Sequence, residues 1–445
     1  QPPNAGLIEL DEAPPLPHDP EAVDVVLTMS AMLQAKPVPA LQPMRKTVVD
    51  GSNTSGFQRT TLVSTNGQLV TKTGEVGVSV ICLEEDSARK LETKSTPEGE
   101  VVTYTLDRLG LPLVEIATEP DIVTPEHAKE SALALGSLLR DTRRVRRGLG
   151  SIRQDLNVSI ACGDRVEIKG CQDLDWIPRI IRIEMARQLH MYRLANQLRD
   201  EANLPPLPPD RRETEITIEN RVAIAANSRV PLEFHDISQS LLSCESTMVK
   251  QALSQGASPI AVRLPGFSGK LGAKDLDKEG SQLPRLGREL ASAAKLAGVA
   301  GIFHSDELPA YGVSEEDVTA IRSSLMLSDS DAFAFCVAPH WQAKLALESV
   351  INRARQAYHR IPQEVRNVVI RKGQPDDGTT TALRPLPGGA RMYPETDIPL
   401  QDISIERWNG ICSNLPLTSD ERSQRLSALD ISANQAESIL NGELD

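Results

Sequence analysis

An apolar strand that ends in three successive acids is predicted by the stretch Gly77-Val-Ser-Val-Ile-Cys-Leu-Glu84-Glu85-Asp86. Two further strands are predicted in the same segment, residues 74–170, at Ser151-Ile-Arg153-Gln-Asp155-Leu-Asn157-Val-Ser-Ile160 and Val166-Glu167-Ile168-Lys169-Gly170. Alternate side chains of a strand share a face. We therefore expect Arg153, Asp155 and Asn157 to project together from one strand, and Glu167 and Lys169 to project together from the next.

Carboxylates gathered on one face of a sheet repel one another unless a cation lies among them. Oxygen-rich clusters of this kind suit Mg²⁺ that carries the phosphates of a nucleotide. A solvated sheet face with salt bridges explains the same pattern equally well, because half-exposed sheets normally alternate apolar and polar residues. Spacing alone leaves both interpretations open.

Composition is that of a soluble globular protein, with 40% hydrophobic and 24% charged residues. A length of 445 residues predicts two or three domains. The net charge of −13 argues against a surface that coats nucleic acid, although a local basic patch is compatible with it.

Six scattered cysteines, with no CxxC pair, indicate reduced thiols and a cytoplasmic location. No apolar run reaches the length of a membrane span and no signal peptide is evident, so we expect no membrane association. The chain begins at Gln1, where a strand over residues 7–10 is already expected, and it therefore reads as a fragment.

A loop rich in Gly, Ser, Thr and Asn is predicted at Gly51-Ser52-Asn53-Thr-Ser55-Gly56-Phe-Gln-Arg59, after a helix over residues 20–32. Such a loop can offer backbone N–H groups to an anion. The Walker spacing is absent, and an ordinary hairpin turn is the stronger interpretation.

Strands are predicted at 75–83, 100–106 and 112–117, before a helix that Thr124 caps and Gly148 ends. The last turns of this helix carry five arginines: Arg140, Arg143, Arg144, Arg146 and Arg147. They either contact phosphates or only complement the helix dipole, and both interpretations stay open. If they bind RNA, we expect Arg143, Arg144 and Arg147 to act as one group on one helix face.

Downstream, a long helix reaches about residue 200, a proline-rich linker follows at 204–209, and a short strand is expected at 215–218. A separate α+β module is predicted over 230–362, where the composition shifts to small residues. Its expected elements are strands at 260–264, 299–304 and 333–337 and helices at 286–297 and 341–360.

Several long motifs together resemble the B/E-subunit family of tRNA-dependent amidotransferases. They are Leu83-Glu-Glu-Asp86, Asp107-Arg-Leu-Gly-Leu-Pro-Leu-Val-Glu-Ile-Ala-Thr-Glu-Pro-Asp121, Ser151–Ser159 and Val166-Glu-Ile-Lys169. Two more, Asp50–Arg59 and Arg391-Met-Tyr-Pro-Glu-Thr-Asp397, are similar to the archaeal E subunits. The module at 230–362 resembles the insertion domain of bacterial aspartyl-tRNA synthetases.

The resemblance implies an α+β fold, a cradle of sheet and helices that an α+β insertion interrupts. The cradle would comprise residues 1–229 and 363–412, the insertion 230–362, and the start of a helical or tail domain 413–445. The family opens with a Gly-Leu-Glu-Ile-His-type strand whose Glu and His join the metal site. That strand and most of the tail domain are missing here, so we expect an incomplete metal site.

The resemblance also implies a reaction, the conversion of Glu attached to tRNA(Gln) into Gln. ATP would phosphorylate the side-chain carboxylate with Mg²⁺ as the catalytic cation, and ammonia would come from an asparaginase-like glutaminase subunit in a heterotetramer. The implied metal or phosphate-site residues are Glu84, Glu85, Asp155 and Glu167, with Lys169 as a further catalytic residue. The implied nucleotide contacts are Arg153, Asn157, Ser52, Asn53, Ser55 and Arg59, and the implied tRNA contacts are Arg143, Arg144 and Arg147.

Two alternatives remain. The chain could be a non-catalytic tRNA-binding module, which would bind tRNA without tRNA-stimulated ATP hydrolysis. It could also be a B-type subunit with a different amidase partner, against which the insertion and the Tyr393-Pro-Glu-Thr-Asp397 motif argue.

Overall fold

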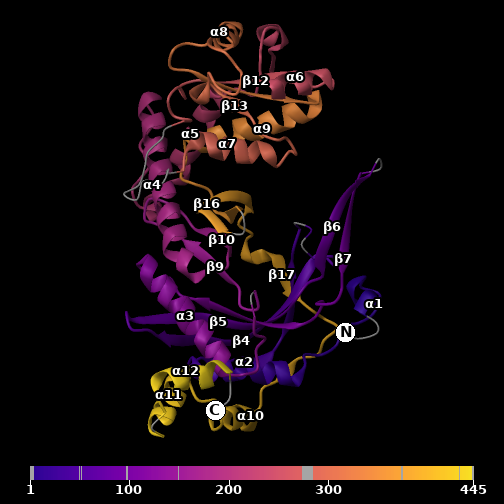
Figure 1. Cartoon of the computed structure of the whole chain (residues 1–445), viewed down its shortest axis with the longest axis vertical. Coiled ribbons are helices and arrows are strands. Elements are labelled where there is room, and N and C mark those ends of the chain that lie inside the picture. Colours follow the sequence, from indigo (N-terminus) through magenta and orange to yellow (C-terminus); the bar gives the residue numbers. More distant parts are fainter. Residues whose placement is uncertain are drawn as a thin grey trace. The chain divides into compact units, whose positions relative to one another are not determined.

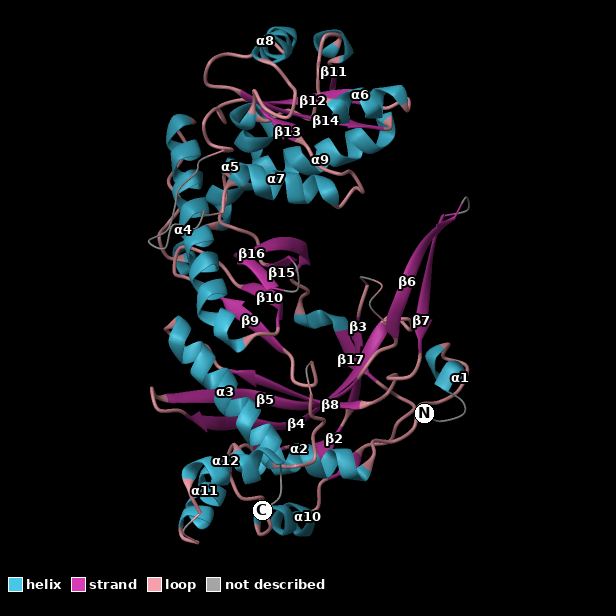
Figure 2. Ribbon diagram, viewed as in Figure 1, coloured by secondary structure: helices cyan, strands magenta, loops and turns pink. Residues whose placement is uncertain are grey.

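The computed structural model describes residues 5–49, 51, 53–96, 99–148, 150–272, 284–371, 374–429 and 431–442. Helices and strands are mixed along the chain, and the predicted α+β class is confirmed (Figures 1 and 2). The chain forms two compact units: unit 1 comprises Gln1–Ile152 and Pro387–Asp445, and unit 2 comprises Arg153–Leu386. In the part of the chain that is described, no helix has both the length and the apolar character needed to cross a bilayer.

Unit 1 is built on an antiparallel sheet with the strand order β17-β3-β4-β5-β8. These strands are β17 (Met392–Pro394), β3 (Pro43–Thr47), β4 (Phe57–Val70), β5 (Glu75–Glu85) and β8 (Pro112–Thr118), and β1 (Lys36–Pro37) also pairs with β4. Strand β17 pairs with β3, which lies more than 300 residues earlier in the sequence. Segments from the first and last parts of the chain therefore belong to one sheet.

Helix α2 (Pro20–Met32) covers one face of this sheet, and its bounds match the prediction. Asp19 accepts a hydrogen bond from the backbone N–H of Glu21, and Pro20 occupies the first turn, so local sequence starts the helix. Its apolar side chains, such as Leu27, pack with Ile81 and Leu83 of β5 in one buried core. This face of the sheet is therefore the core face.

The other elements of unit 1 are shorter or lie around this sheet. They are α1 (Ala5–Glu9), β2 (Ala40–Leu41) paired with β18 (Gln401–Asp402), the hairpin β6 (Arg89–Thr96) and β7 (Gly99–Thr105), α3 (Pro125–Asp141), α10 (Ile405–Cys412), α11 (Ser419–Ser427) and α12 (Ala433–Gly442). Arg407 of α10 donates a hydrogen bond of 2.8 Å to Asp24 of α2.

Unit 2 contains a four-stranded sheet, β16-β15-β10-β9, against which α4 (Ile177–Glu201) packs. Its strands are β9 (Gln154–Val158), β10 (Val166–Cys171), β15 (Glu364–Arg371) and β16 (Gln374–Pro385). Strand β15 runs parallel to β10, whereas the other two pairs are antiparallel. The predicted return segment, 363–412, is therefore shared between the units, since β15 and β16 belong to unit 2 and β17 and β18 to unit 1.

A second sheet of unit 2 has the order β11-β12-β14-β13. Its strands are β11 (His235–Asp236), β12 (Ser258–Leu264), β13 (Phe303–His304) and β14 (Ala332–Ala338), and the helices around it are α5 (Ile216–Arg229), α6 (Thr247–Ser254), α7 (Leu286–Lys295), α8 (Glu315–Ser324) and α9 (His340–Gln356). Short 3₁₀ turns are η1 (Leu174–Trp176), η2 (Arg211–Glu213), η3 (Ser238–Leu241), η4 (Ser305–Glu307) and η5 (Gly389–Arg391). Phe333 and Phe335 of β14 are fully buried in the core of this second sheet of unit 2.

Four predicted elements differ from the structure, and one of them is the strand expected at 299–304, of which only Phe303–His304 forms β13. Residues 7–10 overlap helix α1 instead of forming a strand, and residues 216–218 begin helix α5 instead of a strand. Helix α3 starts at the predicted Thr124 cap but ends at Asp141, well before Gly148. Arg143 adopts a left-handed φ of +54°, which interrupts a helix made of L-residues.

Candidate functional site

Glu84 lies near the end of β5 on the face of the unit 1 sheet that points away from α2. Its carboxylate forms an ion pair with Lys46 of β3 and accepts a 3.3 Å hydrogen bond from Gln58 of β4. Only 7% of Glu84 is exposed. Antiparallel pairing explains this group, because Lys46 lies opposite Gln58, and Thr60 lies opposite Glu84.

Cys82 and Glu115 continue the same face, since they are paired between β5 and β8. Burial raises the pKa of the Cys82 thiol to about 12, and the charges of Glu115 and Glu84 add to the shift. The thiol is therefore protonated at neutral pH and is not a nucleophile. This face, which we call the outer face, combines Lys46, Gln58, Thr60, Cys82, Glu84 and Glu115.

Glu85 points to the opposite face of the sheet, because it follows Glu84 directly in the strand. Its carboxylate is 3.0 Å from Nη1 of Arg59. Burial raises the pKa of Glu85, and the charge of Arg59 opposes that rise. The expectation that Glu84 and Glu85 share one metal site is wrong for this geometry, because each carboxylate faces a different side and has its own cation.

Glu395 of the C-terminal segment anchors the Glu85 side of the sheet. It is 1% exposed and accepts two hydrogen bonds from Arg45, at 2.6 and 3.2 Å, and one of 3.3 Å from Arg59. Both guanidinium groups also lie over the ring of Phe57, at 4.3 and 5.3 Å from its centroid. Burial raises the pKa of the Glu395 carboxyl, but the hydrogen bond and charge of Arg45 outweigh it, so the net shift is downward.

The Gly- and Ser-rich loop joins β3 to β4 as a hairpin connection. The side chains of Asn53 and Ser55 donate hydrogen bonds of 2.9 and 3.0 Å to the carbonyl oxygen of Phe57. These bonds favour the turn interpretation, because they use the polar side chains within the loop itself. Ser52 lies outside the described residues, and the predicted nucleotide contacts of this loop stay predictions.

Asp155, Glu167 and Lys169 come together on the β9–β10 pair of unit 2, as the alternation predicts. The ammonium of Lys169 lies 2.6 Å from Asp155 and 2.7 Å from Glu167. Burial lowers the pKa of Lys169, but the hydrogen bonds that its ammonium donates to the two carboxylates more than compensate, so its pKa is raised and it stays charged at neutral pH. We call this group the β9–β10 trio.

The two predicted neighbours of the trio are exposed. Asn157 accepts a hydrogen bond of 3.0 Å from Nε of Arg165, and Arg153 lies directly before β9. The exposure of residues 153, 155 and 157, with partly buried residues between them, confirms the predicted alternation.

The four carboxylates predicted as metal ligands do not gather into one shell within either unit. Among the described residues, no cluster of three or more His, Cys, Asp or Glu has the geometry to hold a metal ion. Mg²⁺ bound to a nucleotide needs only one or two protein carboxylates, because phosphates and water supply the other ligands. Asp155 and Glu167 fit that requirement, since both converge on the same cation, Lys169.

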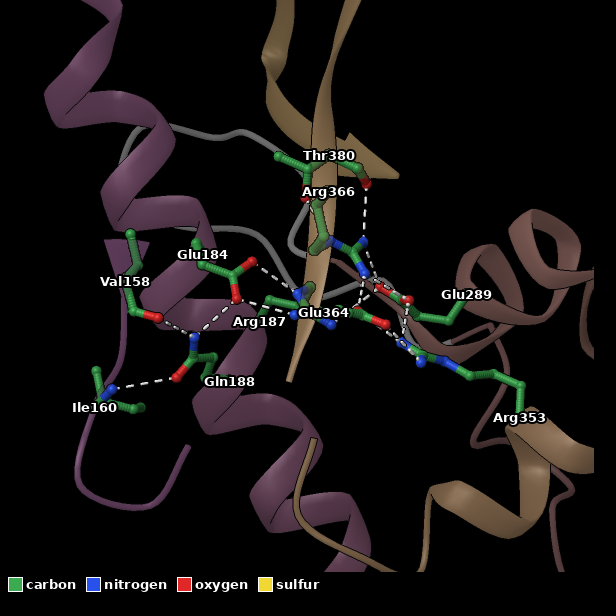
Figure 3. Close-up of polar contacts among 10 residues, drawn as sticks. All are labelled: Val158, Ile160, Glu184, Arg187, Gln188, Glu289, Arg353, Glu364, Arg366 and Thr380. Atoms are coloured by element: carbon green, nitrogen blue, oxygen red, sulfur yellow. Dashed lines mark hydrogen bonds and ion pairs between the residues drawn. The ribbon is translucent and has the colours of Figure 1, made fainter. Parts of the chain in front are cut away.

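A buried cluster of alternating charges lies on the helix side of the unit 2 sheet, and sequence reasoning missed it (Figure 3). Glu289 of α7 accepts hydrogen bonds of 2.7 Å from Arg353 of α9 and 2.9 Å from Arg366 of β15. Glu364 accepts from the same two arginines at 3.0 and 2.6 Å. Arg187 of α4 lies 3.4 Å from Glu289 and completes the connection to that helix.

The cluster contains three arginines and three glutamates, since Glu184 of α4 also pairs with Arg187 at 2.8 Å. We call these six residues the ion cluster: Glu184, Arg187, Glu289, Arg353, Glu364 and Arg366. Gln188 extends it to β9, because it donates to the carbonyl of Val158 and accepts from the N–H of Ile160 (Figure 3). The cluster thus fixes α7 and α9 to the sheet that carries the β9–β10 trio.

The predicted domain boundaries near 229 and 362 therefore fall inside one compact unit. Glu289 and Arg353 come from the predicted insertion, whereas Arg187, Glu364 and Arg366 come from the predicted cradle. Whether 230–362 is a domain with its own folding stability stays a prediction.

The arginine run begins at Arg140 in the last turn of α3 and continues beyond the helix, which ends at Asp141. The five arginines therefore do not lie on one helix face. Arg140, Arg143 and Arg147 line one cavity of unit 1, together with Arg422 of α11. Arg144 instead lies 3.2 Å from Glu21 of α2 and does not line that cavity. The expected grouping of Arg143, Arg144 and Arg147 on one helix face is therefore wrong, and the predicted RNA contact of Arg144 stays a prediction.

Sequence reasoning also missed Lys46, Arg45 and Glu395 at the unit 1 sheet. No spacing signal connects Glu395 to Arg45, because 350 residues separate them. A strand-pairing argument could have found Glu115, since it lies directly opposite Cys82.

The fold and these sites define an α+β protein with two sheets that each present carboxylate–cation groups. The GatB/GatE catalytic domain profile matches residues 1–409, and the chain belongs to that family.

Archaeal proteins that are named as the E subunits of glutamyl-tRNA(Gln) amidotransferase are similar to it along nearly its whole length. The protein from Thermococcus gammatolerans is 44% identical over 440 residues, which is 99% of this chain and 64% of the relative. The protein from Pyrococcus furiosus is 43% identical over 440 residues, which is again 99% of this chain and 64% of the relative. The protein from Methanocaldococcus jannaschii is 41% identical over 421 residues, 94% of this chain and 60% of the relative. The chain thus spans less than two thirds of the length of these relatives.

Proposed function

We propose that this chain is the catalytic part of a tRNA-dependent amidotransferase that converts Glu-tRNA(Gln) into Gln-tRNA(Gln). The observation that carries the proposal is the similarity, over 99% of the chain, to proteins named as the E subunits of glutamyl-tRNA(Gln) amidotransferase. The proposal includes a cytoplasmic complex with an asparaginase-like glutaminase subunit, which supplies ammonia, and ATP and Mg²⁺ as cofactors.

The chemistry explains why such a protein needs accessible carboxylates and cations. A carboxylate is a poor electrophile, so it must be phosphorylated before ammonia can displace a leaving group at its carbonyl carbon. Phosphoryl transfer is catalysed mainly by positioning and by neutralising charge. Mg²⁺ bound to ATP supplies the charge neutralisation between the phosphates.

In the β9–β10 trio, Asp155 and Glu167 would hold the Mg²⁺, and Lys169 would contact phosphate oxygens. The raised pKa of Lys169 supports this role, because a charged ammonium is required to stabilise phosphate charge. Arg153 and Asn157 lie on the same strand face and would contact the nucleotide.

On the unit 1 sheet, the outer face offers Glu84 and Lys46 as a second polar site. We assign to Glu84 the role of orienting Lys46, since the two form a partly buried ion pair. Glu85 and Arg59, on the other face, belong with the Glu395 anchor, so a structural role for them competes with the predicted catalytic one.

Conversion of Glu-tRNA(Gln) to Gln-tRNA(Gln) by the protein at its natural full length tests the proposal, with ammonium as nitrogen donor. ATP-dependent product supports it. Binding of tRNA without tRNA-stimulated ATP hydrolysis would instead favour the non-catalytic tRNA-binding alternative.

A further inference from the structure

Strand β9 carries Asp155 of the β9–β10 trio, and the sheet alone specifies its position weakly. It is an edge strand in the order β16-β15-β10-β9, and among the described strands it pairs only with β10. Of its five residues only Val158 is buried. The register of a strand is specified by its buried face, and a slip of one residue would move Asp155 to the other side of the sheet. A further contact is therefore needed to hold β9 in register.

The β9–β10 ladder is also irregular at the trio itself. Its register shifts between Ile168 and Cys171 of β10. Two residues of β10, Lys169 and Gly170, therefore stand against Asp155 alone, and Gly170 takes a left-handed φ of +84°. Such a bulge disrupts the ladder locally. The ladder by itself therefore does not fix the distance between Asp155 and Lys169.

Gln188 of α4 contacts the end of β9 and the turn that follows it (Figure 3). Its side chain is fully buried. The amide nitrogen donates hydrogen bonds of 3.1 Å to the carbonyl of Val158 and 2.9 Å to Glu184. The amide oxygen accepts a hydrogen bond of 3.2 Å from the N–H of Ile160. Both ends of the amide are therefore used, and two of its three partners are backbone groups beside the trio's edge strand.

The turn between β9 and β10 leaves space for this amide. A Cβ at Gly163 would lie 1.9 Å from Oε1 of Gln188, so the amide would have to move away from any larger residue. The N–H of Gly163 donates a hydrogen bond of 2.9 Å to the carbonyl of Ile160 and closes the turn. Gly163 and Gln188 therefore fit together as a pair.

Glu184 connects Gln188 to the ion cluster. Its carboxylate is 1% exposed, and it pairs with Arg187 at 2.8 Å while it accepts from Gln188. A carboxylate in place of the Gln188 amide would face the carboxylate of Glu184, and like charges repel. The position therefore requires an amide and not only a side chain of this length.

We propose that Gln188 is a positioning residue for the β9–β10 trio. It fixes the register of β9 on β10 and thereby holds the carboxylate of Asp155 beside Lys169. The catalytic consequence rests on the proposed function, in which the trio holds Mg²⁺ and contacts phosphate. Gln188 itself acts only through the strand.

The test compares Gln188→Met with Gln197→Met. Methionine has a similar length but cannot replace the three hydrogen bonds of Gln188. Gln197 lies later in the same helix, is exposed, and contacts Glu201 instead of the sheet. Mass spectrometry follows hydrogen exchange of residues 154–162, with β14 of the same unit as reference.

In Gln188→Met we expect exchange over 154–162 to accelerate by roughly 5- to 150-fold, because buried hydrogen-bonding groups left unpaired favour local opening. Exchange of β14 should keep its rate, and Gln197→Met should change neither segment. Unchanged exchange over 154–162 would overturn the inference. An equal acceleration in β14 would overturn it too, because Gln188 would then support the fold as a whole.

Lys169 provides a second readout of the trio that needs no catalysis. Its ammonium donates to two carboxylates, and acylation by an N-hydroxysuccinimide ester requires the deprotonated amine. If Gln188→Met moves Asp155 away, acylation of Lys169 should rise relative to the exposed Lys295. An unchanged ratio would contradict the positioning role.

Gly163→Ala is the second variant, because it displaces the Gln188 amide without altering Gln188 itself. It should reproduce the local changes in exchange and acylation. The double variant with Gln188→Met should add little to either single variant, since both remove the same contacts. Full additivity would overturn the inference. If Gln188→Met does not fold, Gly163→Ala alone decides.

Amidation by the protein at natural full length, with ammonium as nitrogen donor, measures the catalytic consequence. Gln188→Met should lower turnover by roughly 10–100-fold and raise KM for ATP, while KM for ammonium stays unchanged. A smaller folded population would lower turnover and leave both KM values unchanged, and that pattern would overturn the positioning role. A wild-type protein without amidation activity would contradict the proposed function, and exchange and acylation then decide the inference by themselves.

Discussion

The ion cluster of unit 2 and a cavity of unit 1 that is lined by Arg140, Arg143, Arg147 and Arg422 both contain arginines and acids, but they differ in burial and in charge balance. In the ion cluster, three arginines meet three glutamates away from water, and Arg187 and Arg366 are each 1% exposed. In the cavity, four arginines meet two acids, and three of the arginines are exposed. Balanced buried charge fixes elements to one another, whereas exposed charge at a cavity wall is screened by water and contributes less to the fold.

The largest expected effect comes from unbalancing the ion cluster. Glu289→Gln keeps the shape of the side chain but removes the charge that Arg187, Arg353 and Arg366 share. We expect the free energy of unfolding to fall by about 3–5 kcal/mol, because breaking a buried ion pair leaves an uncompensated charge. Urea unfolding measures the loss, with the exposed Glu348→Gln on α9 as control. Equal stability of the two variants would mean that the cluster is not structural.

Lowering the pH should also unbalance the ion cluster, because it protonates the Glu289 carboxylate. Burial raises the pKa of Glu289, but Arg366, Arg187 and Arg353 outweigh it and lower the pKa below the ordinary value of 4.5. A carboxylate with a lowered folded-state pKa stabilises the fold above its unfolded pKa, and this stabilisation is lost as pH falls through the folded value. Stability should therefore decline below about pH 4.5 less steeply in Glu289→Gln than in the wild type. Identical acid dependence of the two proteins would contradict this assignment.

The contrast between the two regions also shows what sequence can predict. Residues close along the chain were predictable: Thr124 caps α3, Pro20 starts α2, and alternation places Asp155 and Asn157 on one strand face. The run Ile216-Thr-Ile218 favoured a strand because of its β-branched residues, yet it begins helix α5. Tertiary packing overrides propensity in so short a segment.

Groups assembled from distant segments were not predictable. The ion cluster joins Glu184, Glu289 and Glu364, which lie on three elements and share no spacing. Likewise, the cavity requires α11 to lie against the end of α3, which the Asp141–Ser419 contact produces. The arginine run could be recognised as unusual, but only the structure separates Arg144 from Arg140, Arg143 and Arg147.

A smaller effect on stability is expected for the β9–β10 trio. Lys169→Ala removes a partly exposed cation between Asp155 and Glu167. Such pairs contribute about 0–1 kcal/mol, so urea unfolding should change little while amidation activity falls. A loss of stability as large as that of Glu289→Gln would show that the trio is structural instead.

The smallest effect is expected for Arg144→Ala, which removes an exposed pair with Glu21. Its free energy of unfolding, measured in urea, should change by less than about 1 kcal/mol. A loss of several kcal/mol would contradict the expectation that exposed ion pairs of this kind contribute little.

The most direct test of the account is the rate of ATP-dependent conversion of Glu-tRNA(Gln) in Glu167→Gln, compared with Glu348→Gln. Both variants are measured at natural full length, with ammonium as nitrogen donor and with matched melting temperatures. The account predicts that Glu167→Gln loses activity by at least roughly 10–100-fold, since it removes a charged oxygen that is proposed to hold Mg²⁺, while Glu348→Gln is unaffected. Unchanged turnover in Glu167→Gln would contradict the account and leave Glu167 as a salt-bridge partner of Lys169.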